Sequence, residues 1–72
     1  MTKTPSVELV RSGGYLAEVD VELIETEGGW SPYYSLEDAK KIEAVQIALD
    51  RGDVVAAAKL GRVFKVFPVA AE

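Results

Sequence analysis

The chain has 72 residues, of which 49% are hydrophobic, and a formal net charge of −4. It contains neither Cys nor His, which excludes disulfides, thiolate nucleophiles, an imidazole base and the usual zinc ligands. No apolar run approaches the roughly 20 residues that cross a bilayer. We therefore expect a domain without membrane association or cofactor, located in the cytoplasm.

The negative charge is concentrated in the first half of the chain. Up to residue 30 the only bases are Lys3 and Arg11, whereas acids and bases balance from residue 31 onward. A chain without a basic stripe lacks the counterion release that supplies most of the affinity for nucleic acids. We therefore expect no direct binding to nucleic acid.

The domain boundaries follow from composition. Residues 1–6 are polar, interrupted by Pro5 and free of an apolar signal segment, and they are predicted to form a flexible terminus. Residues 7–69 are predicted to form one domain and residues 70–72 a tail. A domain of this size lies near the lower limit of independent stability, which makes association with another chain plausible.

Two alternating runs, residues 7–11 and 15–25, are separated by Ser12-Gly13-Gly14 and predict a β-hairpin. A two-residue loop would place Glu8 in the apolar row. A three-residue loop, ended by Gly14 in a left-handed conformation, pairs Leu9 with Ala17 instead. The pattern therefore favours the three-residue loop, with Glu8 on the solvated face.

The second run alternates cleanly between apolar and acidic side chains, which predicts a sheet with one buried and one solvated face. The carboxylates of this run form either an ordinary solvated face or a docking surface for a basic protein. Alternate carboxylates on one strand lie about 6.6 Å apart, too far to chelate one metal ion unaided, and no metal site is predicted. The acidic residues concerned are Glu18, Asp20 and Glu22.

From Ser35 the period becomes helical. Ser35 is a predicted N-cap, and Gly52 ends the first helix before Asp53 caps a second one over residues 54–60. The second helix offers a single Lys, so a DNA-binding helix-turn-helix is not favoured. The apolar stripe of the first helix consists of Leu36, Ala39, Ile42, Val45 and Leu49.

Residues 62–69 are predicted to form the last strand, with apolar side chains on both of its faces. One face belongs to the core, and the other is expected to be covered by a second subunit. The residues proposed for this self-association are Phe64, Val66 and Phe67.

Little in the sequence could carry catalysis. The acids fall on strand faces, caps and helix surfaces, and the glycine pairs lack the partners of a phosphate-binding loop. The aromatic segment of Trp30, Tyr33 and Tyr34 follows two glycines. These rings either pack over the end of the sheet or anchor a protein partner, since Trp and Tyr are typical interface anchors.

The segment Gly29-Trp30-Ser31-Pro32-Tyr33-Tyr34-Ser35-Leu36-Glu37-Asp38-Ala39, followed by Ala48-Leu49-Asp50-Arg51-Gly52-Asp53 and the strand at 62–69, resembles a group of small bacterial proteins. The resemblance covers most of the chain after Glu18 and implies no established activity. Some chains of this size are antitoxins, and that analogy implies a basic toxin as partner.

The sequence therefore predicts an α+β fold of order ββααβ, an antiparallel three-stranded sheet with two helices on one face. The function expected is that of a non-enzymatic protein-interaction module, able to form homo-oligomers. The partner-binding residues proposed are Glu18, Asp20, Glu22, Trp30, Tyr33 and Tyr34. The alternative is a small-molecule-binding or small catalytic domain that uses carboxylates and tyrosines.

Overall fold

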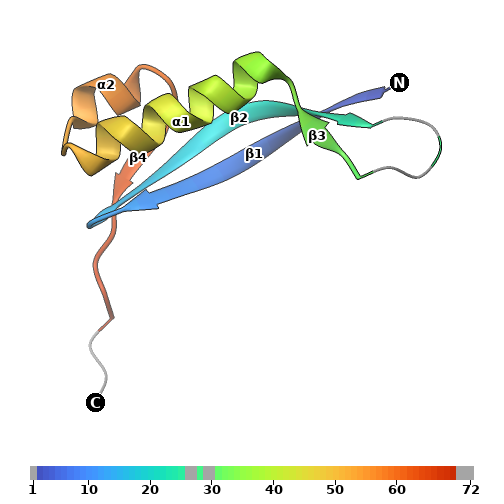
Figure 1. The fold of residues 1–72 in the computed structure, drawn as a ribbon. Coiled ribbons are helices and arrows are strands. Elements are labelled where there is room, and N and C mark those ends of the chain that lie inside the picture. Colours follow the sequence, from blue (N-terminus) through green and yellow to red (C-terminus); the bar gives the residue numbers. More distant parts are fainter. Residues whose placement is uncertain (1, 26–27, 29–30, 70–72) are drawn as a thin grey trace.

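The structure is a computed structural model that describes residues 2–25, 28 and 31–69 (Figure 1). It is a small α+β domain in which two helices pack against an antiparallel sheet, and this predicted fold class is confirmed. A two-residue strand, β3, was not predicted. The elements are β1 (Thr2–Ser12), β2 (Tyr15–Glu25), β3 (Tyr33–Tyr34), α1 (Leu36–Asp50), α2 (Val54–Ala58) and β4 (Arg62–Lys65).

β2 is the centre of the sheet. β1 pairs with it along one side, while β3 and β4 share its other side at opposite ends. β4 lies opposite residues 15–18 of β2 and runs antiparallel to it, as predicted. β3 lies opposite Leu23 and Ile24. Residues 19–22 of β2 consequently face neither strand on that side, which leaves a gap in the sheet.

The predicted hairpin register is wrong by one residue. Val10, not Leu9, lies opposite Ala17, and the loop is the two-residue turn Gly13-Gly14. Gly13 has φ +58°, the positive sign that a type II′ turn requires at its first central position. Glu8 therefore faces the helices.

The helix-facing position of Glu8 is tolerated because its carboxylate accepts a hydrogen bond from the hydroxyl of Tyr34. A polar group placed against a core is acceptable once it is hydrogen-bonded. The alternation of apolar residues alone does not reveal this partner, which lies 26 positions away in the sequence.

The prediction that residues 1–6 carry no regular structure is also wrong, because β1 begins at Thr2. Pro5 fits within the strand for a geometric reason. Its partner Glu22 directs its backbone N–H away from β1, towards Asp38. Pro5 therefore lies at a position where β1 makes no bond to β2, and its missing N–H falls on the outer edge.

Helix α1 begins where the sequence predicts. The Ser35 hydroxyl accepts a hydrogen bond from the Asp38 backbone N–H at 3.1 Å, which confirms the N-cap. Val45 and Leu49 of the predicted stripe are buried, but Leu36 is 70% exposed. The core lies under the second half of the helix, where Ala48 is buried as well.

The second helix and the last strand are shorter than predicted. Asp53 caps α2, which ends at Ala58, and β4 ends at Lys65, although the Val66 N–H still donates to Gly14 O. Between them Gly61 passes very close to β2. A Cβ at Gly61 would lie 2.6 Å from Glu18 O, so this crossing requires glycine.

The core is small and built from small side chains. Among the residues that the structure describes, the largest fully buried ones are Val19 and Val45. The radius of gyration is 14.6 Å, against about 11 Å for a typical globular chain of this length. The molecule is flat, with a sheet face that the helices do not cover. The buried apolar residues are Val10, Ala17, Val19, Val21, Ile24, Val45, Ala48, Leu49 and Ala57.

Candidate interaction surface

The sheet has an open face, opposite the helices. Because Ala17, Val19 and Val21 point into the core, the alternate residues of β2 and their cross-strand partners point the other way. We define the open face by these residues: Lys3, Pro5, Val7, Leu9, Arg11, Leu16, Glu18, Asp20, Glu22, Ile24, Tyr33, Arg62 and Phe64.

An apolar row crosses the open face from β4 to β1. Leu16 lies directly opposite both Phe64 and Arg11, and Leu9 lies one pair further along. Phe64 is 47% exposed, Leu9 56% and Val7 46%. Large side chains left half-exposed on one sheet face are typical of a surface that another molecule covers.

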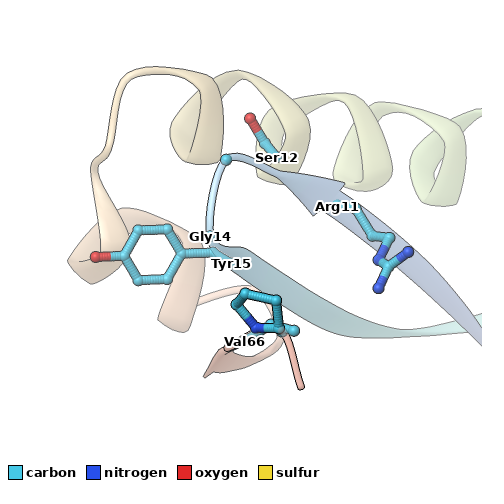
Figure 2. A pocket seen from close by; sticks show the side chains of 7 residues that line it. Arg11, Ser12, Gly14, Tyr15 and Val66 are labelled. Atoms are coloured by element: carbon cyan, nitrogen blue, oxygen red, sulfur yellow. The ribbon is translucent and has the colours of Figure 1, made fainter. Parts of the chain in front are cut away.

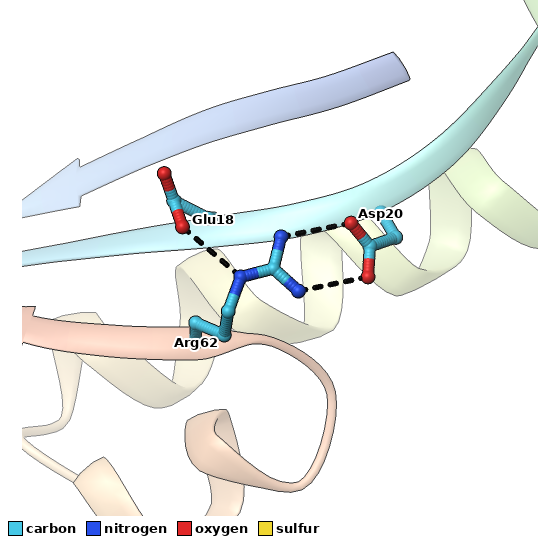
Figure 3. Close-up of polar contacts among 3 residues, drawn as sticks. All are labelled: Glu18, Asp20 and Arg62. Carbon is cyan, nitrogen blue, oxygen red and sulfur yellow. Dashed lines mark hydrogen bonds and ion pairs between the residues drawn. The ribbon is translucent and has the colours of Figure 1, made fainter. Parts of the chain in front are cut away.

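An ion-paired cluster borders this row (Figure 3). The Arg62 guanidinium donates to both carboxylate oxygens of Asp20, at 2.8 and 2.9 Å, and to Glu18 at 3.0 Å. The hydrogen bonds from Arg62 lower the pKa of Asp20, and the two carboxylates raise the pKa of Arg62. Arg62 thus offsets part of the acidic charge predicted for this face, leaving one net negative charge on the three residues.

The structure joins Glu18 and Asp20, two of the predicted site residues, to Arg62, which was not predicted. The β4 register places Arg62 directly opposite Glu18. A sequence-level signal existed, namely a base at the first position of the last strand. It becomes informative only once the pairing of β4 with β2 is known.

Glu22, the third predicted acid, is exposed and lies beside the gap in the sheet. Its backbone N–H donates to the Asp38 carboxylate at 2.8 Å, so the first turn of α1 closes the gap. Lys41 lies 3.9 Å from Asp38. A shallow hollow of about 500 Å³ is lined here by Pro5, Asp20, Val21, Glu22, Asp38 and Lys41.

The three predicted aromatic site residues do not form one surface. Tyr34 is half-buried, packs against the core and donates to Glu8, so it stabilises the fold. This hydrogen bond, together with burial, raises the pKa of Tyr34. Tyr33 is 49% exposed and, as the neighbour of Tyr34 on a strand, points to the open face. Trp30 lies outside the described residues.

The residues predicted for self-association are exposed near the end of the chain. Phe64 is 47%, Val66 38% and Phe67 71% exposed, and the Lys65 ammonium lies 5.5 Å from the centre of the Phe67 ring. Phe64 belongs to the open face. A contact surface must be exposed before a partner covers it, and these three side chains are exposed. Self-association through them stays a prediction.

A second hollow, of about 520 Å³, lies at the hairpin turn (Figure 2). Ser12 points towards α1 and donates to Asp50, whereas Arg11 points to the opposite side of the strand. Arg11 is the only charged residue lining this hollow among the described residues, so it offers no acid–base pair. Its lining is Arg11, Ser12, Gly13, Gly14, Tyr15, Val66 and Pro68.

Within the described ranges no three potential metal ligands come together. Neither α1 nor α2 is long and apolar enough to cross a membrane. Comparison of the chain with protein-family models, with curated proteins and with solved structures gave no match.

Proposed function

We propose that this protein is a cytoplasmic, non-enzymatic module that binds another protein through the open face of its sheet. The observation that carries the proposal is the apolar row of Val7, Leu9, Leu16 and Phe64, most of it exposed, on a molecule whose largest fully buried side chains among the described residues are valines. Covering this row would bury apolar area that the chain cannot bury on its own.

The carboxylates on the β2 side of the row favour a basic partner there, whereas Lys3 and Arg11 make the β1 side of the open face positive. Glu18, Asp20 and Glu22 outnumber Arg62 on the β2 side of the row. Complementary charges raise the association rate, while a desolvated apolar or aromatic anchor sets the dissociation rate. Among the described residues Phe64 is the aromatic side chain within the row, and Tyr33 is exposed on the same face at the other end of β2. The antitoxin analogy, with its basic toxin, agrees with this assignment.

The proposal is tested by affinity capture from cells that express the protein natively. The immobilised baits are the wild type, Leu9→Asp and Val55→Asp, the last a matched control because Val55 is 71% exposed but lies on α2. We expect a basic protein that the wild type and Val55→Asp retain and that Leu9→Asp loses.

Direct binding is then measured by calorimetry with the purified partner. Glu22→Lys should weaken the complex at low ionic strength, and the difference from wild type should shrink in high salt. The same set of captured proteins on all three baits would contradict an open-face function, as would a retained metabolite that is insensitive to Leu9→Asp.

A further inference from the structure

The outer edge of β1 carries backbone groups that lie beside no other strand of the described chain. β1 pairs with β2 on one side only. Because Glu22 directs its N–H away from β1, its partner Pro5 and the other odd-numbered residues of β1 direct their backbone groups outward. An edge of this length is a template for pairing with another strand. The outward residues are Lys3, Pro5, Val7, Leu9 and Arg11.

Two features interrupt this edge. Pro5 has no N–H to donate. The carbonyl oxygen of Arg11 already accepts a hydrogen bond from the Gln46 side chain of α1, at 3.3 Å. Between them Val7 and Leu9 present their backbone donors and acceptors to the edge.

We propose that a second copy of this chain pairs with this edge, β1 antiparallel to β1, with Val7 of each copy opposite Leu9 of the other. In this register Pro5 comes opposite Arg11. The bond that Pro5 cannot donate is the bond to the Arg11 carbonyl, which Gln46 already occupies. In each of the two Pro5–Arg11 pairs both interruptions therefore fall on the same hydrogen bond, and the remaining bonds of the ladder can form.

The helix layer fits the same pairing. The first turn of α1 lies at the gap on the far side of β2, through Asp38, whereas its last turns reach the β1 edge through Gln46 and Asp50. The helix thus crosses the sheet diagonally and covers the end of β1. At the start of β1, Thr4 is exposed on the helix-facing side and Ser6 half-exposed. The antiparallel partner would bring its helix end to this uncovered part.

The pair of residues on the two-fold axis is Glu8 opposite Glu8, which by itself is unfavourable because like charges repel. Tyr34 reduces this cost. Its strand, β3, lies on the side of β2 away from β1, and its hydroxyl binds the Glu8 carboxylate. The carboxylate is thereby drawn towards β2 and away from the axis.

The pairing also extends the open face, because Val7 and Leu9 of one copy would adjoin Leu9 and Val7 of the other on that side. The inference concerns the edge of the sheet and is independent of the partner proposed for its face. The match between Pro5 and Arg11 favours a second copy of this chain, because a strand of another protein would not place these two interruptions opposite each other.

The register is tested by single-cysteine variants, which is straightforward because the chain contains no Cys. Glu8→Cys places two thiols at a non-hydrogen-bonded pair with Cα atoms about 4.5 Å apart, within the range of a disulfide. Ser6→Cys is the control, since its two copies would lie about 13 Å apart along the strands. Mild oxidation should link Glu8→Cys into covalent dimers at least tenfold faster than Ser6→Cys. Equal rates would overturn the register.

Self-association is tested independently by sedimentation over a micromolar concentration range. The wild type should dimerise. Val7→Pro removes an outward N–H that makes no bond to β2, and it should be monomeric with an unchanged circular dichroism spectrum. Val7→Ala keeps the N–H and should still dimerise. A monomeric wild type, or a Val7→Pro variant that dimerises like the wild type, would overturn the proposal. If Val7→Pro fails to fold, the two cysteine variants decide.

Discussion

Glu8 lies on the helix-facing side of β1, opposite to the predicted side, and its hydrogen bond with Tyr34 makes this position tolerable. Removing the phenol hydroxyl in Tyr34→Phe leaves the half-buried ring in place but leaves a carboxylate beside the core without its donor. We expect a lower melting temperature for Tyr34→Phe than for wild type.

The matched control for this prediction is Tyr33→Phe, which alters the neighbouring, half-exposed ring. Its melting temperature should stay close to that of the wild type. If the two variants melt together, the Tyr34–Glu8 hydrogen bond does not contribute to stability.

Asp20 provides a prediction on pH. Its pKa in the folded chain lies below its ordinary value of 3.8 because Arg62 donates to it. The stability that Asp20 contributes is therefore present above pH 3.8 and is lost as the pH falls through the lower, folded pKa. Both groups are exposed, so the effect should be small.

The test compares urea midpoints of the wild type and Asp20→Asn. The variant should have the lower midpoint at pH 7, and the difference should be smaller near pH 2, because Asp20 loses its charge as the pH falls through its lowered pKa. A difference that is the same at both pH values would show that Asp20 acts through something other than its charge.

At the scale of the element, the start of α1 depends on Ser35. Ser35→Ala removes the acceptor of the Asp38 N–H and should cost about 1 kcal/mol. Ser31→Ala, at an exposed position before the helix, is the control and should leave the thermal midpoint unchanged. Equal midpoints for both variants would mean that the cap contributes nothing.

The entry into β4 depends on Gly61. In Gly61→Ala the new Cβ would meet the Glu18 carbonyl oxygen at 2.6 Å, so backbone must move and the β2–β4 pairing should loosen. We expect a clearly lower thermal midpoint. Gly14→Ala is the control, because its Cβ meets only Val66 O at 3.8 Å, an ordinary contact. Similar losses in both variants would contradict the close approach at Gly61.

At the scale of the whole molecule, the small core makes each buried side chain costly to lose. Leu49 is the largest side chain of the helix that is almost fully buried, at 3% exposure. Leu49→Ala should cost about 2–3 kcal/mol, a large share of the ~5 kcal/mol expected for a marginal domain. Ile47→Ala, 45% exposed on the same helix, should cost much less. Urea unfolding measures both, and equal losses would contradict the assignment of the core.

The local elements of this protein are determined by the sequence alone, because short-range chemistry is enough. The Ser35 hydroxyl caps an amide three residues away, and Gly52, with φ +73°, ends α1 before Asp53 starts α2. The alternation of β2 likewise predicts which of its faces is buried. These features do not depend on contacts with distant parts of the chain.

The register, the extra strand and the candidate surface are decided only by the tertiary structure, because each depends on residues far apart in the sequence. Tyr34 satisfies Glu8 on the helix-facing side, Asp38 closes the gap beside β3, and Arg62 binds both Glu18 and Asp20. The hydrophobic pattern of a sequence shows only whether each side chain is polar or apolar. It does not show which distant donor will satisfy that side chain, and here the distant donor makes the helix-facing position of Glu8 tolerable.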